Sequence, residues 1–134
     1  MSAGAGTPTA PGLGMATETK TTRDRNHQPF QALEVALEIV GSLRGVVQVI
    51  RRHNVKLAEQ IVASASSVAA NLAEGNRRSG RDRVSFFRIA AGSADETRTH
   101  LRVAMAWGFI QAADTEAAMQ LIDRELAMLW RLTH

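Results

Sequence analysis

Apolar residues recur at helical spacing along most of the chain and predict four helices. The first, residues 29–52, carries two adjacent apolar stripes. One stripe contains Phe30, Leu33, Leu37, Val40 and Val47, and the other contains Ala36, Ile39, Leu43, Val46 and Ile50. Together they make a wider buried face than contact with two neighbouring helices needs. The excess apolar surface is predicted to face a second copy of the chain.

The second predicted helix covers residues 55–74 and is rich in small side chains. Alanine and serine fill most positions around its apolar stripe, which allows a neighbouring helix to approach closely. Asn54 is a favourable N-cap residue, and Gly75 is predicted to end the helix.

Two more helices are predicted over residues 80–107 and 114–132. Ser79 precedes the first of these, with Asp82 three residues further on, a variant of the capping box. Asp114 is predicted to cap the last helix.

The fold class that follows is all-α. No segment alternates apolar and polar residues as a half-buried strand would, and the links between helices are short. We therefore predict an antiparallel up-down-up-down four-helix bundle over residues 29–134. Residues 1–28 contain only Leu13 and Met15 as sizeable apolar groups and are predicted to form a disordered tail.

The composition excludes several classes of functional site. The chain has 134 residues, a formal net charge of +3 and no cysteine. Disulfides, thiolate metal sites and cysteine nucleophiles are therefore excluded. No signal-peptide pattern or membrane-length apolar run is present, so we expect a soluble, cytoplasmic protein without membrane contact.

No arrangement of residues points to catalysis or to a cofactor. Glu96 and His100 lie one helical turn apart, but the remaining ligands of a carboxylate-bridged di-iron bundle are missing. No phosphate-binding glycine loop, Ser-His-Asp set or paired-carboxylate site is recognisable. We expect no metal, no cofactor and no enzymatic activity.

Bundle topology places the link between the second and third helices at one pole, and this link is basic. The candidate nucleic-acid-binding residues there are Arg77, Arg78, Arg81, Arg83 and Arg88. An arginine fork can donate two parallel hydrogen bonds to phosphate, and free N–H groups at the start of a helix add to the attraction. A contact with a partner protein is an alternative. A solvated end with local pairs, such as Arg78 with Asp82, is another.

Ser64, Ser67, Asn71 and Glu74 form a polar stripe at helical spacing on the second helix. They could line a subunit interface or a narrow polar seam, or hydrogen-bond back to their own chain and to neighbouring helix ends. We favour a structural role for all four.

Two further pairs have both structural and functional interpretations. Phe86 and Phe87 lie among the arginines, where base stacking is conceivable, but Phe87 belongs to the core stripe, so both are assigned to the core or a subunit interface. Gly41 and Gly45 indicate either a close helix contact or a weaker helix.

Three sequence runs resemble a known family. They are Asn71-Leu72-Ala73-Glu74-Gly75, Phe87-Arg88-Ile89-Ala90-Ala91-Gly92-Ser93 with Glu96 and Leu101 after it, and Trp107-Gly108-Phe109-Ile110. The chain is similar to the four-helix-bundle proteins named after open reading frames in 23S ribosomal RNA intervening sequences. The same superfamily includes the accessory variability determinant of diversity-generating retroelements. The proline that the family usually carries in its second helix is absent from the run Ser67-Val68-Ala69-Ala70-Asn71.

The resemblance implies a bundle that assembles into a ring-like homo-oligomer, with pentamers known. The retroelement proteins bind nucleic acid through basic surface and contact a reverse transcriptase. The leading hypothesis is a non-enzymatic oligomer that binds nucleic acid, structured RNA first, through the basic pole, as accessory or scaffold to an RNA-handling enzyme. The alternative is a protein-interaction module without a nucleic-acid role.

Overall fold

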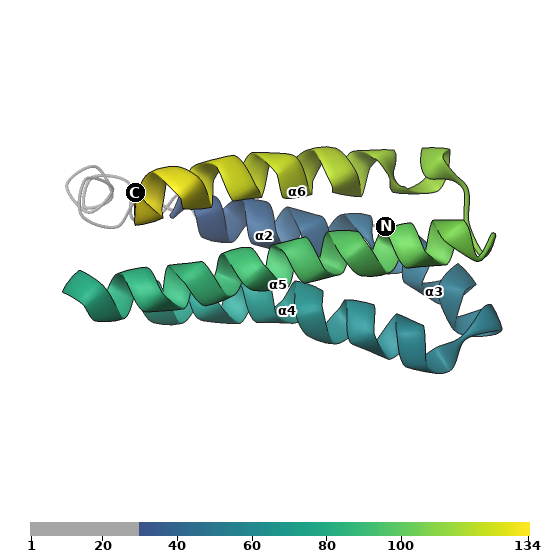
Figure 1. Cartoon of the computed structure of the whole chain (residues 1–134), viewed down its shortest axis with the longest axis horizontal. Coiled ribbons are helices and arrows are strands. Elements are labelled where there is room, and N and C mark those ends of the chain that lie inside the picture. The colour runs from purple at the N-terminus through teal and green to yellow at the C-terminus, as the bar shows by residue number, and fades with distance from the viewer. Residues whose placement is uncertain (1–29) are drawn as a thin grey trace, which may run out of the picture.

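The structure is a computed structural model that describes residues 30–134, and these residues form five helices and no strand. The helices are α2 (Gln31–Ser42), α3 (Arg44–His53), α4 (Val55–Asn76), α5 (Gly80–Ala106) and α6 (Ala112–Thr133). Figure 1 shows α2 and α3 as one arm, followed by α4, α5 and α6 in alternating directions. Both α2 and α5 pack on α4 and on α6, so arms that follow each other in sequence lie side by side. The predicted all-α bundle is confirmed, while the predicted tail, residues 1–28, lies outside the described residues.

The prediction of one continuous helix over residues 29–52 was wrong, because the helix breaks at Leu43. The break follows a Gly41-Ser42 pair, a common origin of sharp kinks. The Ser42 hydroxyl donates to the carbonyl of Ile39 over 2.7 Å, and the Leu43 N–H donates to the Val40 carbonyl over 3.1 Å. This tighter turn redirects α3 toward α4 (Figure 1).

The capping role predicted from the sequence is found for one residue and differs for two. The Asn54 side-chain oxygen accepts a hydrogen bond from the Leu57 N–H over 2.9 Å, which confirms the predicted cap of α4. Ser79 occupies the N-cap position of α5, but its side chain makes no capping bond. α6 begins at Ala112, before Asp114, and the Asp114 carboxylate accepts from the Gln111 N–H over 2.8 Å. Asp114 therefore stabilises the first turn from inside the helix.

Gly75 does not end α4, which continues to Asn76. It is buried against the next helix instead. A Cβ atom at this position would lie 2.7 Å from Cε1 of Phe87 and 3.1 Å from Cβ of Phe86. Glycine is needed here because α4 and α5 approach too closely for any side chain.

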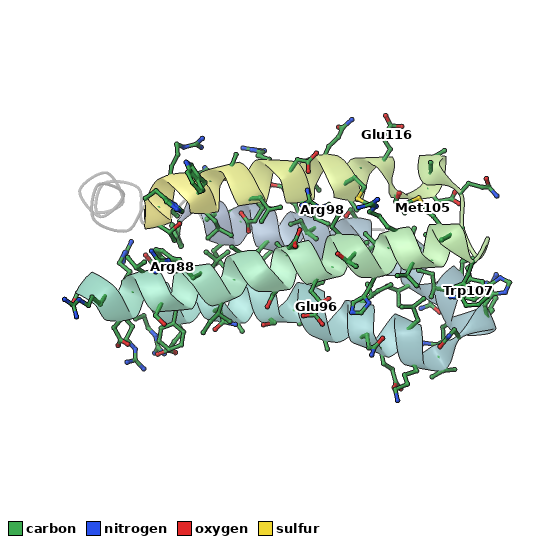
Figure 2. The ribbon with its side chains drawn as sticks, viewed as in Figure 1. Arg88, Glu96, Arg98, Met105, Trp107 and Glu116 are labelled. Carbon is green, nitrogen blue, oxygen red and sulfur yellow. The ribbon has the colours of Figure 1, made fainter. Side chains whose placement is uncertain are left out.

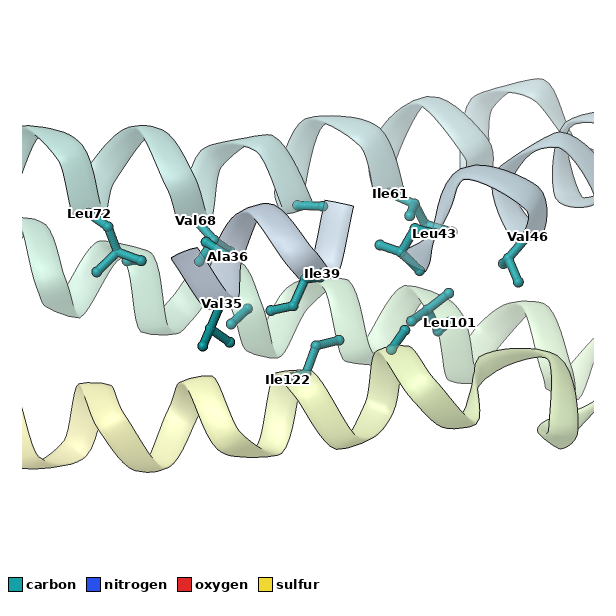
Figure 3. Close-up of a cluster of buried hydrophobic side chains, with 14 of the residues drawn as sticks. Val35, Ala36, Ile39, Leu43, Val46, Ile61, Val68, Leu72, Leu101 and Ile122 are labelled. Atoms are coloured by element: carbon teal, nitrogen blue, oxygen red, sulfur yellow. The ribbon is translucent and has the colours of Figure 1, made fainter. Parts of the chain in front are cut away.

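The core lies between the four arms, and Figure 3 shows part of it. The second predicted stripe of the first arm is buried throughout: Ala36, Ile39, Leu43, Val46 and Ile50. The other stripe stays partly at the surface, where Leu37 is 51% exposed. An added Cβ at Gly41 or Gly45 would meet nothing within 4 Å, so neither glycine makes a close contact among residues 30–134.

Glu125 of α6 is the unexpected member of the core. Its side chain is fully buried, and neither carboxyl oxygen has a hydrogen-bond partner among the described residues. Burial raises the pKa of this carboxyl to about 8, against a smaller opposing effect of Arg124. The folded protein therefore favours the protonated, uncharged acid at neutral pH.

None of the helices formed by residues 30–134 combines the length and the apolar character that crossing a membrane requires.

Candidate nucleic-acid interface

The α4–α5 turn brings the predicted arginines together at one end of the bundle. Gly80, with φ of +62°, follows this turn and begins α5 in a backbone conformation that favours glycine. Arg77 and Arg78 lie in the turn, and the other three lie on the first turns of α5. Figure 2 labels Arg88 near the end of the bundle at which α5 begins.

Arg77 and Arg78 are held by carboxylates of the adjoining helices. Both pair with Glu74, and Arg78 also donates to Asp82 over 2.6 Å. Hydrogen bonds from Arg77 and then Arg78 lower the pKa of Glu74, and the bond to Glu74 contributes most to raising the pKa of Arg78. The guanidinium of Arg78 also lies 5.1 Å from the centre of the Phe86 ring. Two of the five cations are thus engaged with the turn itself.

Arg83 closes the end of α4. Its Nη1 donates to the backbone carbonyls of Asn76 and Arg78 over 3.2 and 3.4 Å. Its guanidinium also lies 4.9 Å from the centre of the Phe87 ring. Carbonyls at a helix C-terminus are otherwise without intrahelical donors. Arg83 therefore positions the turn.

Arg81 and Arg88 differ from the other three arginines. Both are exposed, and neither forms an ion pair with any residue in the range 30–134. They are seven residues apart, two turns on one face of α5. Both line an open hollow of about 860 Å³, here called the arginine hollow, with Gly80, Val84, Ser85, Ile89 and Thr133. None of its lining residues among those that the structure describes carries a carboxylate.

The predicted polar stripe lies on α4 where that helix meets α5. The Ser64 hydroxyl lies 2.7 Å from the hydroxyl of Thr97, and the Ser67 hydroxyl lies 2.8 Å from that of Ser93. Asn71 donates from Nδ2 to the carbonyl and the hydroxyl of Ser67 over 2.9 and 3.0 Å. The three form a polar seam between the helices, and the fourth stripe residue, Glu74, lies at its end with the arginines.

Sequence reasoning missed the partners of this seam. Ser93 and Thr97 are four residues apart on α5 and face α4. Their spacing matches that of a polar stripe on a helix, so the signal was present. What could not be read from one sequence was which residue of α4 each would meet.

The remaining candidates have structural surroundings. Phe87 is fully buried, 5.7 Å from the ring centre of Phe30, and Phe86 is partly buried. His100 and Glu96 approach each other with Nε2 and Oε2 3.3 Å apart. Among residues 30–134 no group of three or more potential metal ligands occurs.

Comparisons with known proteins agree with this architecture. The profile of a family described as 23S rRNA-intervening sequence protein matches residues 30–131. A similar solved structure is a crystal structure of a protein with unknown function from the S23 ribosomal protein family of Bacteroides thetaiotaomicron, with a TM-score of 0.68 and 20% sequence identity. The match covers 76% of this chain and 97% of that one, and at this identity it shows the fold. The comparison with curated proteins found no significant match.

Proposed function

We propose that this chain, which belongs to the family of 23S rRNA-intervening sequence proteins, binds nucleic acid through the arginine hollow. Structured RNA is the first candidate. In this proposal the protein is a non-enzymatic, self-associating cytoplasmic bundle, accessory or scaffold to an RNA-handling enzyme such as a reverse transcriptase.

One observation carries the proposal. Arg81 and Arg88 lie exposed on the same face of α5, in a hollow without a carboxylate. Their unpaired guanidinium forks suit the oxygen atoms of phosphate groups. The two paired arginines of the turn are balanced by Glu74 and Asp82, so the proposal rests on Arg81 and Arg88.

The proposal predicts that the double variant Arg81→Ala/Arg88→Ala weakens RNA binding about tenfold at moderate salt, because two phosphate contacts are lost. The slope of log affinity against log salt concentration should become shallower by about 2. Fluorescence anisotropy with a labelled RNA hairpin and a DNA duplex, across a salt series, measures both quantities.

Arg102→Ala is the matched control, since Arg102 is an exposed arginine further along α5, forms no ion pair among residues 30–134 and does not line the arginine hollow. It should bind like the parent protein. Undetectable binding of the parent protein at low salt, or equal affinity in the double variant and the parent, would refute the proposal.

Self-association rests on a different surface. Leu37 and Val62 are 51% and 46% exposed on α2 and α4. Between the first arm and α4 lies a hollow of about 290 Å³. Apolar residues, among them Val40, Val47 and Val62, make up more than half of its lining, together with Arg44 and Arg51. Apolar surface gathered in this way is typical of a protein contact.

The variant Leu37→Lys/Val62→Lys is therefore expected to convert the oligomer to a monomer, because charged groups would be buried in the contact. Light scattering after size-exclusion chromatography measures the mass. Trp130→Lys, at a residue 62% exposed near the end of α6 and away from this surface, should keep the oligomer. A monomeric parent protein at micromolar concentration contradicts self-association.

The same apolar surface supports the second candidate function, a module that docks another helical protein. Co-purification of a specific partner that survives high salt and nuclease, and is lost in Leu37→Lys/Val62→Lys, would favour this function. If the variant Arg81→Ala/Arg88→Ala still captures this partner, then docking of the partner does not depend on nucleic-acid binding.

A further inference from the structure

The pole opposite the arginine hollow carries a set of stacked rings. Trp107, which follows α5, is 71% exposed. Its ring lies within 12° of parallel to that of Phe109, and Phe109 stacks on His53 with ring centres 4.8 Å apart and planes 5° apart. Figure 2 shows Trp107 and Arg88 toward opposite ends of the molecule. An indole this exposed forgoes most of the burial that normally stabilises an aromatic side chain.

The loop backbone fixes this arrangement. Gly108 has φ of +79°, a left-handed conformation that reverses the chain between the two rings. The Phe109 N–H donates to the carbonyl of Ala104 over 3.0 Å, and Ile110 is buried in the core. Phe109 is thereby held against His53, which leaves the indole of Trp107 outermost.

Beside Trp107 lies a hollow of about 240 Å³ with polar groups on its wall. Its lining is Asn54, Lys56, Leu57, Gln60, Val103 and Trp107. The Asn54 oxygen is occupied by the cap of α4, while its Nδ2 donates to no residue in the described chain. Gln60 and Lys56 are exposed. The hollow thus combines an aromatic face, two side-chain amides and an ammonium group.

The surroundings are basic. The last turn of α3 carries Arg51, Arg52 and His53 next to this hollow in sequence. Neither arginine, nor Lys56, pairs with a carboxylate within residues 30–134. Two acids lie near these residues in the sequence: Asp114, in the first turn of α6, is engaged with the Gln111 N–H, and Glu59 of α4 is exposed. The unpaired cations Arg51, Arg52 and Lys56 therefore outnumber the acid that is not engaged. An anion is therefore the charge-complementary occupant.

We infer that this hollow binds an unpaired nucleobase together with its phosphate. The base stacks on the outer face of Trp107, its edge meets the amides of Asn54 and Gln60, and the phosphate pairs with Lys56. Stacking of this kind accepts any base, because each base has a π-face. The contact is independent of the arginine hollow and suits a single-stranded segment or a free nucleotide.

The experiment follows the fluorescence of Trp107 in a Trp130→Phe background, where Trp107 is the one indole. The titrants are adenosine monophosphate, a single-stranded oligoadenylate and inorganic phosphate. Saturable quenching by the nucleotide and the oligonucleotide is expected, without quenching by phosphate. Quenching by the oligonucleotide alone assigns the site to a strand, and equal quenching by both, per nucleotide, assigns it to a free nucleotide.

Variants define the contacts. Trp107→Leu should weaken binding of a fluorescein-labelled oligoadenylate about tenfold, the loss that one stacking platform produces. Trp130→Leu is the matched control, since Trp130 is 62% exposed and stacks on His134 at the C-terminus, and it should leave this affinity unchanged. Lys56→Ala should reduce quenching, and Arg81→Ala/Arg88→Ala should not, so failure of the proposed function leaves this result intact.

Two outcomes overturn the inference. One is an unchanged Trp107 emission with nucleotide and oligonucleotide at low salt. The other is an emission that shifts on dilution of the protein and ignores nucleotide, which would assign the indole to a contact between copies of the chain.

Discussion

Replacing Glu125 with methionine is expected to stabilise the protein by about 3 kcal/mol at pH 8. The Glu125 carboxyl is fully buried, and its oxygens have no hydrogen-bond partner among residues 30–134. Methionine is of similar length and apolar, so it fills the same space without a desolvation penalty. Chemical denaturation of the parent and the Glu125→Met variant measures the difference in free energy of unfolding.

The gain depends on pH in a defined direction. The pKa of Glu125 is raised from 4.5 to about 8 in the folded state, so between these values the folded protein holds a proton that the unfolded chain has released. The contribution of Glu125 to the free energy of unfolding therefore falls as pH rises through this window and levels off above pH 8. The advantage of Glu125→Met should be smallest near pH 5, where only the cost of a buried neutral acid without hydrogen bonds remains, and largest above pH 8.

Glu125→Gln separates the cost of burying an ionisable group from the cost of burying a polar group without hydrogen bonds. It removes the titration but leaves a buried amide without partners, so its pH dependence should match that of Glu125→Met at a lower stability. A difference between the parent and Glu125→Met that stays constant from pH 5 to pH 9 would show that the carboxyl is hydrated in solution.

The second large effect concerns two glycines in long helices. Gly75→Ala is expected to destabilise the protein by about 2 kcal/mol, because the new Cβ would lie 2.7 Å from the Phe87 ring. Gly92→Ala, on α5, meets nothing within 4 Å and should stabilise the protein by up to about 1 kcal/mol through helix propensity. Thermal denaturation should therefore rank Gly92→Ala above the parent and Gly75→Ala below it.

The two substitutions make the same chemical change in a helix, so their difference isolates the contact between α4 and α5. If Gly75→Ala were as stable as Gly92→Ala, the Phe87 ring would have room to move, and the helices would pack less closely than described.

The sequence predicted the helices because the apolar spacing is long and regular. It could not predict the break at Leu43, since Leu43, Val46 and Ile50 continue the same stripe and are buried as expected. The break depends on a glycine-serine pair and on the hydrogen bond from Ser42 to Ile39. Gly75 was misassigned for a related reason, because its role is a tertiary contact with Phe87 and not a local helix stop.

For the candidate site, the sequence located the arginines and suggested the pair of Arg78 with Asp82, which the structure contains, but it did not separate Arg81 and Arg88 from the others. Which guanidinium groups are engaged depends on the geometry of the α4–α5 turn, which brings Arg83 to the carbonyls of Asn76 and Arg78. The buried Glu125 was missed because it neighbours Leu126 in the sequence. Met119, Ile122, Leu126 and Leu129 recur at helical spacing, which favours Leu126 as an inward residue, but the structure buries Glu125 completely and Leu126 only in part.

The order in which the arms pack affects how fast the protein is expected to fold. α4 and α5 are joined by a short turn, α5 and α6 by a short loop, and each pair is in direct contact. Contacts between sequence neighbours need little loop closure, which places the bundle among fast-folding topologies of low contact order. The α2–α6 contact joins the arms that lie furthest apart in the sequence, so it requires the longest loop closure, and the buried Glu125 belongs to α6. Because this closure docks the helix that contains Glu125, we expect the rate of folding as well as the stability to respond to pH.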